Sequence, residues 1–305
     1  MYDLIIIGGG PAGVSAGVYA SRKQLKTLFI TPEWGGQSTV SPDIHNWIGT
    51  PSISGTKLAE DLETHLRTYA GEWVDIKDKA YVTNIEKTDA GHRVHFGDQS
   101  AEAAAILIAT GSKRRRLDVP GADELEHKGL TYCATCDGPI FAGQDVAVIG
   151  GGNAAFETAA QLLAYTKSVT LLNRGDSYKA DPVTVEKVLA HPNMTGLTGA
   201  TTTKVSGDKF VSGLSYTDAD GVDQTLDVTG IFMEIGMIPN TDYVGDAVAL
   251  DAYGRIEIDP WTQQTTTPGI WAAGDCTNIK YHQNNISAGD AVKALEDIYV
   301  TLKAK

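Results

Sequence analysis

Two cysteines, Cys133 and Cys136, stand three positions apart in the stretch Thr131–Gly138, and they are two of the three cysteines in the chain. A dithiol at this spacing closes into a small ring, so its disulfide is short-range and readily reduced. Asp137 follows at once and is placed to move protons for a thiolate. No metal site is expected, because a zinc site would need a second ligand pair at comparable spacing. The stretch predicts a redox-active disulfide, with two unreactive loop thiols as the alternative.

A glycine-rich turn follows the first apolar run of the chain. Leu4–Ile7 is typical of a buried parallel strand and Val14–Lys23 of a helix, with Gly8, Gly10 and Gly13 between them in the pattern G-x-G-x-x-G. In a strand–turn–helix setting, such glycines let the backbone approach a pyrophosphate, whose charge the helix N-terminus stabilises. The turn therefore predicts a dinucleotide-binding site.

An acidic residue, Glu33, stands about where a ribose-binding carboxylate is expected after the second strand of such a unit. It lies past the end of the predicted strand Lys26–Ile30 and beside Pro32. This placement argues against a ribose contact by Glu33.

The same plan recurs about 140 residues later along the chain. Asp145–Ile149 predicts a strand and Asn153–Tyr165 a helix, and the turn between them, with Gly150, Gly152 and Asn153, has the form G-x-G-x-x-A. Two dinucleotide sites and one dithiol describe a two-electron relay from a nicotinamide through a second cofactor, such as a flavin, to a disulfide. The pattern predicts this class of enzyme without saying which nucleotide occupies which turn.

The last part of the chain has no room for a third nucleotide-binding unit. Gly269–Asp275 predicts a strand that ends in an acidic loop, and Asn285–Lys303 predicts a terminal helix. We expect this tail to complete the first domain. The predicted fold is α/β, with two Rossmann-like dinucleotide-binding domains and the second inserted into the first. The first would comprise residues 1–116 plus 245–305, and the second residues 117–244.

The composition excludes several classes of partner. The net charge is −13 and the pI about 4.9, which disfavours nucleic acid and anionic membranes. No apolar run approaches the roughly 18–20 residues of a membrane span. The N-terminus shows no secretory signal pattern, and the sparse cysteines fit a reducing compartment. We expect a cytoplasmic protein that binds neither nucleic acid nor membrane.

The sequence resembles the low-molecular-weight thioredoxin reductases and the closely related flavoprotein core of alkyl hydroperoxide reductase. The resemblance covers essentially the whole chain, and its motifs are jointly specific. They are Gly8–Gly13, Gly35–Gln37, Asn46–Gly49, Ala109–Gly111, Cys133–Gly138, Gly150–Asn153, Ile235–Gly236, Pro239–Thr241 and Ala273–Asp275.

This resemblance implies FAD in the discontinuous first domain, held by the first glycine loop, and a pyridine nucleotide in the inserted domain. It implies that Cys136 faces the flavin, that Cys133 attacks the disulfide of a protein substrate, and that Asp137 donates and accepts protons. Homodimers, and a rotation of the two domains between functional states, are further expectations. The residues expected around the flavin and its ribityl chain are Gly36, Gln37, Asn46, Gly111, Asp275, Gln283 and Asn284.

The segment expected to read the nicotinamide nucleotide, Leu172–Lys179, departs from the family pattern. NADPH-dependent members carry a His-Arg-Arg run and a further arginine there, which clamp the 2′-phosphate. In this chain Arg174 and Lys179 keep two basic positions, while Gly175 replaces an arginine. NADH-using relatives place a glutamate where Asn173 stands. We expect NADPH as the donor, with NADH as the alternative and a non-nicotinamide donor such as ferredoxin after it.

The resemblance predicts a thioredoxin-disulfide reductase. The hydroperoxide-reductase flavoproteins carry a fused N-terminal thioredoxin-like module, and this sequence starts at the glycine loop, so a separate thioredoxin- or glutaredoxin-like carrier is expected. The alternatives are a flavin-dependent dithiol oxidase, which needs no nicotinamide, and a redox-sensing binding protein. Cys276 is interpreted as a structural thiol, and His282, beside Gln283, as a residue near the flavin edge.

Overall fold

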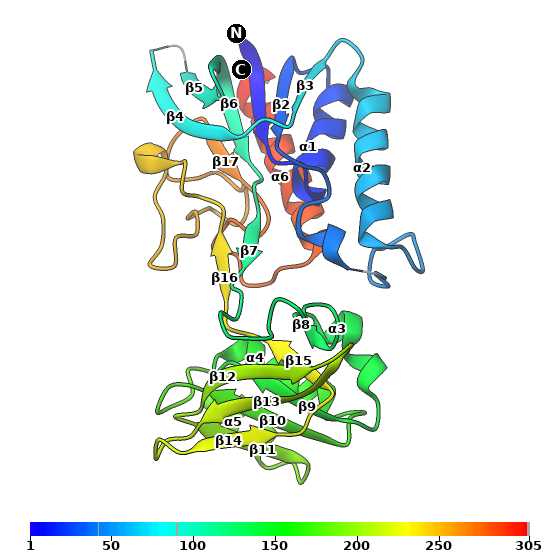
Figure 1. Cartoon of the computed structure of the whole chain (residues 1–305). Helices are drawn as coiled ribbons and strands as arrows, with labels where there is room; N and C mark the ends of the chain where they lie inside the picture. Colours follow the sequence, from blue (N-terminus) through cyan, green and yellow to red (C-terminus); the bar gives the residue numbers. More distant parts are fainter. Residues whose placement is uncertain (42, 90, 304–305) are drawn as a thin grey trace. The chain divides into compact units, whose positions relative to one another are not determined.

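The chain folds into two units in a computed structural model, which describes residues 1–41, 43–89 and 91–303, except for the side chain of Cys136. The first unit combines Met1–Lys113 with Ile238–Lys305, and the second is Arg114–Met237. The chain therefore leaves the first unit once and returns to it once (Figure 1). The two crossing segments are β7 (Ser112–Arg114) and β16 (Met237–Pro239), which pair in a two-stranded sheet.

The first unit is built on one sheet with the strand order β3-β2-β1-β6-β5-β4, and β17 also pairs with β6. Parallel pairing joins β1 to both β2 and β6, while β4, β5 and β6 pair in antiparallel fashion. Because β17 comes from the end of the chain, the tail completes this sheet, as the sequence predicts. The strands are β1 (Tyr2–Ile7), β2 (Thr27–Thr31), β3 (Val74–Asp78), β4 (Val82–Thr88), β5 (Gly91–Phe96), β6 (Gln99–Ile108) and β17 (Ile270–Ala272).

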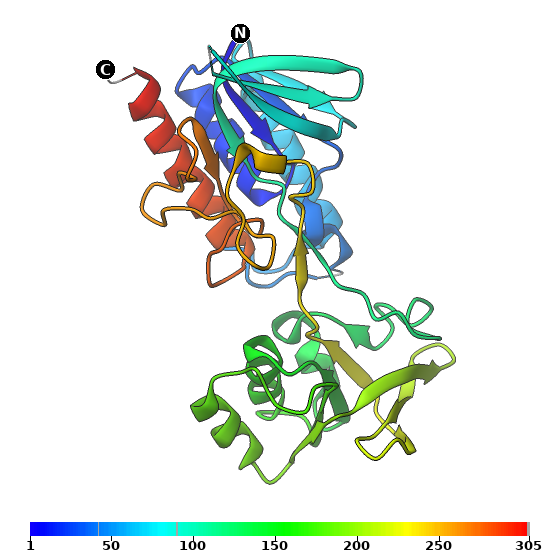
Figure 2. The ribbon, with the colours of Figure 1, turned by 90° about the vertical axis from the view of Figure 1, so that its left-hand side faces the viewer.

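Three helices, α1 (Pro11–Arg22), α2 (Gly55–Ala70) and α6 (Asn284–Lys303), pack together beside this sheet (Figures 1 and 2). In α2 the buried leucines recur every fourth residue, which gives the helix one apolar face. The Ser54 hydroxyl accepts a hydrogen bond from Lys57 N and caps the same helix. Two short 3₁₀ turns, η1 (Gly36–Val40) and η3 (Gly245–Ala247), interrupt the loops.

The second unit has an all-parallel sheet with the order β11-β10-β9-β15-β8, and a separate antiparallel sheet with the order β12-β13-β14. The parallel strands are β8 (Leu130–Thr131), β9 (Asp145–Ile149), β10 (Ser168–Asn173), β11 (Met194–Thr198) and β15 (Gly230–Met233). The antiparallel strands are β12 (Thr201–Gly207), β13 (Val211–Thr217) and β14 (Asp223–Leu226). Its helices are α3 (Ala134–Asp137), η2 (Gly138–Phe141), α4 (Asn153–Leu162) and α5 (Pro182–Leu189).

Both units place a glycine turn and a helix directly after a central parallel strand, β1 followed by α1 and β9 followed by α4. The predicted fold class, two Rossmann-like units with the second inserted, is confirmed. Among the described helices, none is long and apolar enough to cross a membrane.

The unit boundaries differ from those that the sequence predicts, which are 116/117 and 244/245; they lie at 113/114 and 237/238. Arg115 N donates to Gly236 O at 3.1 Å, which ties the end of the basic run to the second unit. Val244 is fully buried in a core cluster of the first unit. These side-chain and backbone contacts form between residues far apart in the sequence, so composition alone does not show them.

Candidate functional site

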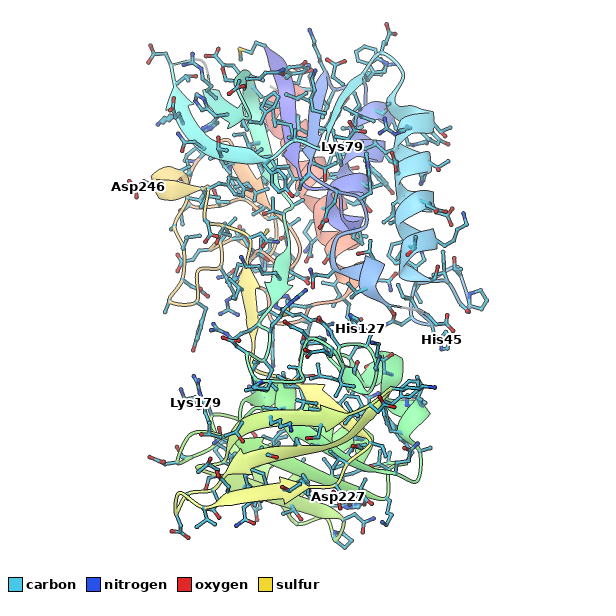
Figure 3. The ribbon with its side chains drawn as sticks, in the orientation of Figure 1. His45, Lys79, His127, Lys179, Asp227 and Asp246 are labelled. Carbon is cyan, nitrogen blue, oxygen red and sulfur yellow. The ribbon has the colours of Figure 1, made fainter. Side chains whose placement is uncertain are left out.

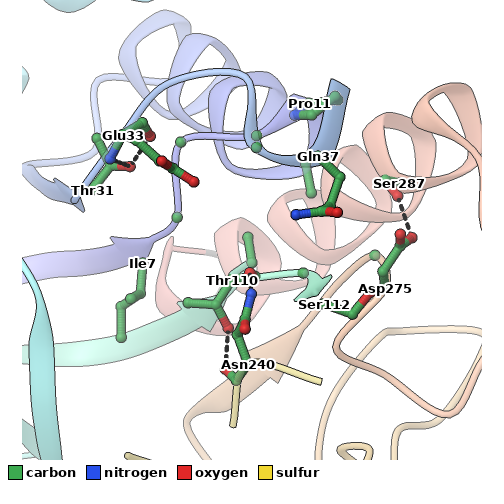
Figure 4. A pocket seen from close by; sticks show the side chains of 18 of the residues that line it. Ile7, Pro11, Thr31, Glu33, Gln37, Thr110, Ser112, Asn240, Asp275 and Ser287 are labelled. Carbon is green, nitrogen blue, oxygen red and sulfur yellow. Dashed lines mark hydrogen bonds between the residues drawn. The ribbon is translucent and has the colours of Figure 1, made fainter. Parts of the chain in front are cut away.

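A cavity of about 410 Å³ opens in the first unit, where β1, β2, β6 and β17 end (Figure 4). The carboxyl ends of parallel strands are where open α/β sheets bind ligands, at the point where the strand order reverses. Of the residues that the sequence assigns to the first nucleotide site, the cavity is lined by Gly8, Gly10, Gly36, Gln37, Gly111, Asp275 and Asn284.

The three glycines of the first turn serve two different purposes. Gly8 has a φ of 122°, and a Cβ there would lie 2.2 Å from the carbonyl oxygen of Ala109. A Cβ on Gly13 would lie 1.8 Å from Gly8 O, so Gly13 permits close packing of the helix on the turn. A Cβ on Gly10 would meet none of the described atoms within 4 Å. Gly10 therefore leaves the backbone open to a ligand at the N-terminus of α1, which is what a pyrophosphate needs.

Glu33 lines the cavity, although its sequence position argues against a role. The Thr31 hydroxyl donates to Glu33 O at 2.5 Å, and this bond turns the chain back after β2 (Figure 4). The turn brings Glu33 to the cavity in spite of Pro32. A carboxylate here is suited to accept hydrogen bonds from ribose hydroxyls.

Asp275 stands at the opposite side of the cavity, before α6 (Figure 4). Its Oδ1 accepts a hydrogen bond from Ser287 Oγ at 3.2 Å, and His282 Nδ1 lies 3.4 Å from the same oxygen. Ser287 therefore orients the carboxylate, and His282 lies beside it. The expected place of His282 near the flavin edge stays a prediction.

A polar cross-link that the sequence does not reveal joins Thr110 to Asn240 in the cavity wall. Thr110 Oγ1 donates to Asn240 O at 2.8 Å, and Asn240 Nδ2 donates to Thr110 O at 3.0 Å (Figure 4). Tyr243 Oη donates to Thr110 Oγ1 at 3.3 Å, and burial raises the pKa of Tyr243 far above its ordinary value. This cross-link joins the segment after β6 to the segment after β16 and so fixes one wall of the cavity.

Two predicted site residues, Asn46 and Gln283, lie outside the cavity lining and contact each other. Asn46 Nδ2 donates to Gln283 Oε1 at 3.0 Å. The neighbouring Asn284 accepts a hydrogen bond from Ser38 Oγ at 3.0 Å. These bonds join the loop after β2 to the start of α6.

The dithiol segment lies in the second unit, between β8 and η2. Cys133 is disulfide-bonded, and Asp137 N donates to Cys133 O at 3.0 Å across the single turn of α3. The Thr131 hydroxyl donates to Oδ2 of Asp137. The side chain of Cys136 falls outside the described part of the chain, so its pairing with Cys133 stays a prediction.

The second glycine turn has the same conformational and packing features as the first. Gly150 has a φ of 148°, and a Cβ there would lie 2.3 Å from Glu234 O, just as Gly8 packs on the residue after β6. At Gly152, as at Gly10, no described atom lies within 4 Å of the position of a Cβ. Asn153 Oδ1 accepts from Asp181 N at 2.7 Å. The turn therefore leaves a second open backbone approach at a helix N-terminus.

The side chain of Asn173, at the end of β10, turns inward to its own loop. Its Nδ2 donates to Gly175 O at 3.0 Å and to Ser177 O at 2.9 Å, and its Oδ1 accepts from Gly175 N at 3.3 Å. Arg174 and Lys179 are exposed, and Figure 3 shows Lys179 pointing outward. Asn173 thus shapes the loop, and the side chains of Arg174 and Lys179 are exposed to solvent.

Comparison with known proteins agrees with this geometry. Residues 2–289 match the family model for pyridine nucleotide-disulphide oxidoreductases. The chain belongs to this family. The oxidoreductase is 33% identical to the thioredoxin reductase from Streptococcus pyogenes, with a TM-score of 0.88 over 100% of this chain and 99% of that one. The thioredoxin reductase from Giardia duodenalis is 31% identical, with a TM-score of 0.91 over the same shares of both chains.

Among curated relatives, the oxidoreductase is 40% identical to an alkyl hydroperoxide reductase component of Staphylococcus epidermidis over 295 residues. It is 36% identical to a Bacillus subtilis protein named NADH dehydrogenase over 294 residues. These matches cover 96% of this chain and 57% of each relative, so the chain spans little more than half their length. The resemblance to the thioredoxin reductases and the hydroperoxide-reductase core is confirmed.

The family implies FAD and a nicotinamide cofactor, and the oxidoreductase has features that fit both. Each unit offers a glycine turn with an open approach at Gly10 or Gly152, directly at a helix N-terminus. The first unit adds a cavity with a carboxylate at each side, Glu33 and Asp275. A dinucleotide needs a donor-rich turn for its phosphates and acceptors for its ribose hydroxyls.

The half-buried carboxyl group of Glu234 lies beside the second glycine turn, after β15. Its Oε1 accepts a hydrogen bond from Thr158 Oγ1, a buried hydroxyl of α4, at 2.7 Å. Burial raises the pKa of Glu234 to about 7, and the neighbouring charge of Glu157 acts in the same direction, whereas the Thr158 bond and the charge of Arg114 oppose it.

We predict that replacing Glu234 with glutamine stabilises the second unit at alkaline pH. Between about pH 4.5 and pH 7 the folded state holds a proton that the unfolded state has lost, so stability falls as pH rises through this window. Above it, the wild type bears a cost on the order of 3 kcal/mol that glutamine lacks. Urea unfolding at about pH 5 and pH 8 measures the difference. The exposed Glu186→Gln of α5 is the control, because Glu186 is not among the groups that shift the pKa of Glu234. Equal stability of Glu234→Gln and wild type at pH 8 would contradict the prediction.

The third cysteine, Cys276, follows Asp275 and is fully buried in a core cluster of the first unit. Its thiol donates to the carbonyl oxygens of Ile108 and Ala273, at 3.7 and 3.5 Å. Burial raises its pKa to about 11, so this thiol stays protonated. The structural interpretation of Cys276 agrees with these contacts. The residues that the structure describes include no group of three or more His, Cys, Asp or Glu side chains suited to a metal ion.

Proposed function

We propose that this protein is an FAD-dependent thioredoxin-disulfide reductase, passing electrons from a nicotinamide nucleotide to the disulfide of a separate thioredoxin- or glutaredoxin-like protein. The first unit would hold FAD, and the second would hold the nicotinamide nucleotide and the dithiol. The observation that carries the proposal is the disulfide-bonded Cys133, which lies just before the glycine turn of the second unit. The first unit has a glycine turn of the same form.

The relatives support this direction of electron flow. Thioredoxin reductases match the chain over its whole length, and the hydroperoxide-reductase proteins match it over part of theirs. FAD, when bound, supplies a two-electron carrier between a hydride donor and a dithiol. We infer from the family resemblance that the protein forms a homodimer in the cytoplasm, and analytical ultracentrifugation tests the dimer.

The dithiol step uses Cys133 and Cys136. The Cys133 thiolate attacks one sulfur of the carrier disulfide, forming a mixed disulfide while the other carrier sulfur leaves as a thiolate. Cys136 then attacks the Cys133 sulfur, which restores the internal disulfide and releases the second carrier thiolate. Two electrons have passed to the carrier, and its two sulfurs take up the two protons that the enzyme thiols give up. Asp137, at the end of α3, would exchange those protons.

We propose NADPH as the preferred donor, with NADH as the alternative. Arg174 and Lys179 are exposed beside the second glycine turn, where a 2′-phosphate would add negative charge. The amide of Asn173 is bonded within its own loop, so it is not placed to select the 2′-hydroxyl in the way a glutamate would. The relatives named NADH dehydrogenase keep the alternative open.

Arg174→Ala is predicted to lower the ratio of kcat/KM for NADPH over that for NADH about tenfold, because a guanidinium–phosphate contact contributes on the order of 1.4 kcal/mol. Steady-state kinetics with both nucleotides measures the ratio. Lys187, an exposed cation of α5, gives the matched control Lys187→Ala, which should leave the ratio unchanged. An unchanged ratio in Arg174→Ala would show that this residue does not read the 2′-phosphate.

Stopped-flow reduction of the bound flavin by NADPH, NADH and reduced ferredoxin tests the donor. Steady-state reduction of a panel of thioredoxins and glutaredoxins tests the acceptor. Rapid flavin bleaching by a nicotinamide nucleotide, followed by carrier reduction, is the expected result. Flavin that is reduced by a small dithiol and reoxidised by oxygen, with no response to either nucleotide, would replace the proposal with a dithiol oxidase.

A further inference from the structure

The hydroxyl of Thr131 holds the carboxylate that follows the dithiol. Thr131 ends β8 and is 5% exposed, and its Oγ1 donates to Oδ2 of Asp137. Within the described residues, no other side chain is hydrogen-bonded to Asp137. The contact therefore sets which way this carboxylate faces.

The backbone on both sides of the contact is held in place. Thr131 pairs with Phe232 of β15, which is fully buried, and its β-branched side chain has few alternative rotamers. Asp137 N is bonded to Cys133 O, and the next residue, Gly138, packs so closely on Tyr165 that a Cβ would lie 2.0 Å from its Oη. Neither the backbone of Thr131 nor that of Asp137 can shift far without disturbing these neighbours, so the orientation of the carboxylate depends on the Thr131 hydroxyl.

We propose that Thr131 is a positioning residue for proton exchange at the dithiol. Its hydroxyl donates to Oδ2 of Asp137 and so fixes the plane of the carboxylate, with Oδ1 as the oxygen that would take a proton from an enzyme thiol and return it. A rotating carboxylate would present an oxygen to the sulfur for only part of the time, so fixing it raises the rate of proton transfer. The inference rests on the proposed function, in which Asp137 acts as acid and base.

Two tyrosines, Tyr132 within the segment and Tyr165 beside Gly138, carry ionisable hydroxyls near Asp137. Tyr132 Oη donates to Glu126 Oε1 at 3.0 Å, and Arg114 lies over the Tyr132 ring at 5.3 Å. Burial, followed by the Glu126 bond, raises the pKa of Tyr132 to about 12, and burial also raises the pKa of Tyr165. Both phenols therefore stay neutral over the pH range in which thiols titrate.

The test compares Thr131→Val, which keeps the shape and removes the hydroxyl, with Thr131→Ser, which keeps the hydroxyl and removes the methyl group. The FAD-loaded protein is reduced with excess dithiothreitol and desalted without air. Its reaction with an aromatic disulfide, dithiodipyridine, is followed by stopped flow from about pH 5.5 to about pH 9. This reaction needs neither a nicotinamide nucleotide nor a protein carrier, so it does not depend on those parts of the proposed function.

We expect Thr131→Val to react at least about tenfold more slowly than wild type near pH 6, and at a similar rate above the ordinary thiol pKa of about 8.5, where the thiols ionise unaided. Thr131→Ser should follow the wild-type profile. A purely structural threonine would instead give a loss that is equal at all pH values, and Thr131→Ser would share it. Either that pattern or a wild-type profile for Thr131→Val overturns the inference.

Asp137→Asn distinguishes the acid–base role of Asp137 from the positioning role of Thr131. This variant should show the same loss of rate at low pH. If it does and Thr131→Val does not, the inference about Thr131 is wrong while the role of Asp137 stands. If Asp137→Asn reacts like wild type, the acid–base role of Asp137 is wrong and the inference falls with it.

Thr202→Val is the matched control, because Thr202 is a buried threonine of the same unit whose hydroxyl has no partner in the part of the chain that the structure describes. Should Thr131→Val fail to fold, Thr131→Ala carries the same test.

Discussion

Replacing Cys133 with serine is expected to slow reduction of a thioredoxin-like carrier at least about 1000-fold, because a serine hydroxyl is hardly ionised at neutral pH and cannot form an exchangeable disulfide. The measurement is steady-state carrier reduction with a nicotinamide nucleotide in excess. Anaerobic bleaching of the flavin, read in the same sample, shows that the remaining parts of the protein are assembled.

Cys276→Ala is the matched control for this loss. The Cys276 thiol is fully buried and bonded to backbone carbonyls in the first unit, so its removal should cost stability and leave carrier reduction close to the wild-type rate. Carrier reduction by Cys133→Ser within tenfold of wild type would mean that electrons reach the carrier by another route.

The elements that hold the two glycine turns could be predicted from sequence because each depends on local periodicity. Apolar strands, glycine spacing and the helical stripes of α1, α2 and α4 all repeat within a few residues. The return of the tail to the first unit followed from a count of elements, since a strand and one helix cannot build a third nucleotide domain. These patterns can be recognised without any knowledge of the contacts between residues that are distant in the sequence.

The residues that escaped the sequence analysis depend on contacts with no local signature. Glu33 reaches the cavity because the Thr31 hydroxyl turns the chain, and the sequence shows only that it lies past the strand. The bonds between Thr110 and Asn240 join residues 130 positions apart. No periodicity predicts a pair at that separation. For the same reason the boundaries predicted from sequence differ from those of the structure, which lie at 113/114 and 237/238.

Asn173 shows a different limit. The resemblance implies a glutamate at this position in NADH-using relatives, and the sequence shows only that asparagine replaces it. In the structure the amide is hydrogen-bonded to Gly175 and Ser177, so the residue builds the loop and does not face outward. A residue type at a motif position predicts a role when its side chain is free to face the ligand, and that freedom is set by the local backbone.

Replacing Gly10 with alanine is expected to weaken FAD binding at least about tenfold without unfolding the protein. Gly10 has φ −79° and ψ −175°, which alanine adopts freely, and a Cβ there would meet no described atom within 4 Å. The new methyl group would project into the open approach at the N-terminus of α1. It would therefore interfere with a bound pyrophosphate and with little else.

Titration of FAD into apo-protein measures the affinity, and thermal unfolding of the same apo-protein measures stability. Gly13→Ala should fail differently, because its Cβ would lie 1.8 Å from Gly8 O and the turn itself would be disrupted. Gly289→Ala, on the surface of α6, should change neither affinity nor fold. Wild-type FAD affinity in Gly10→Ala would place the pyrophosphate away from this turn.

Because Gly152 has the same open geometry, Gly152→Ala should weaken binding of the nicotinamide nucleotide instead. The two alanine variants together test which nucleotide each unit binds.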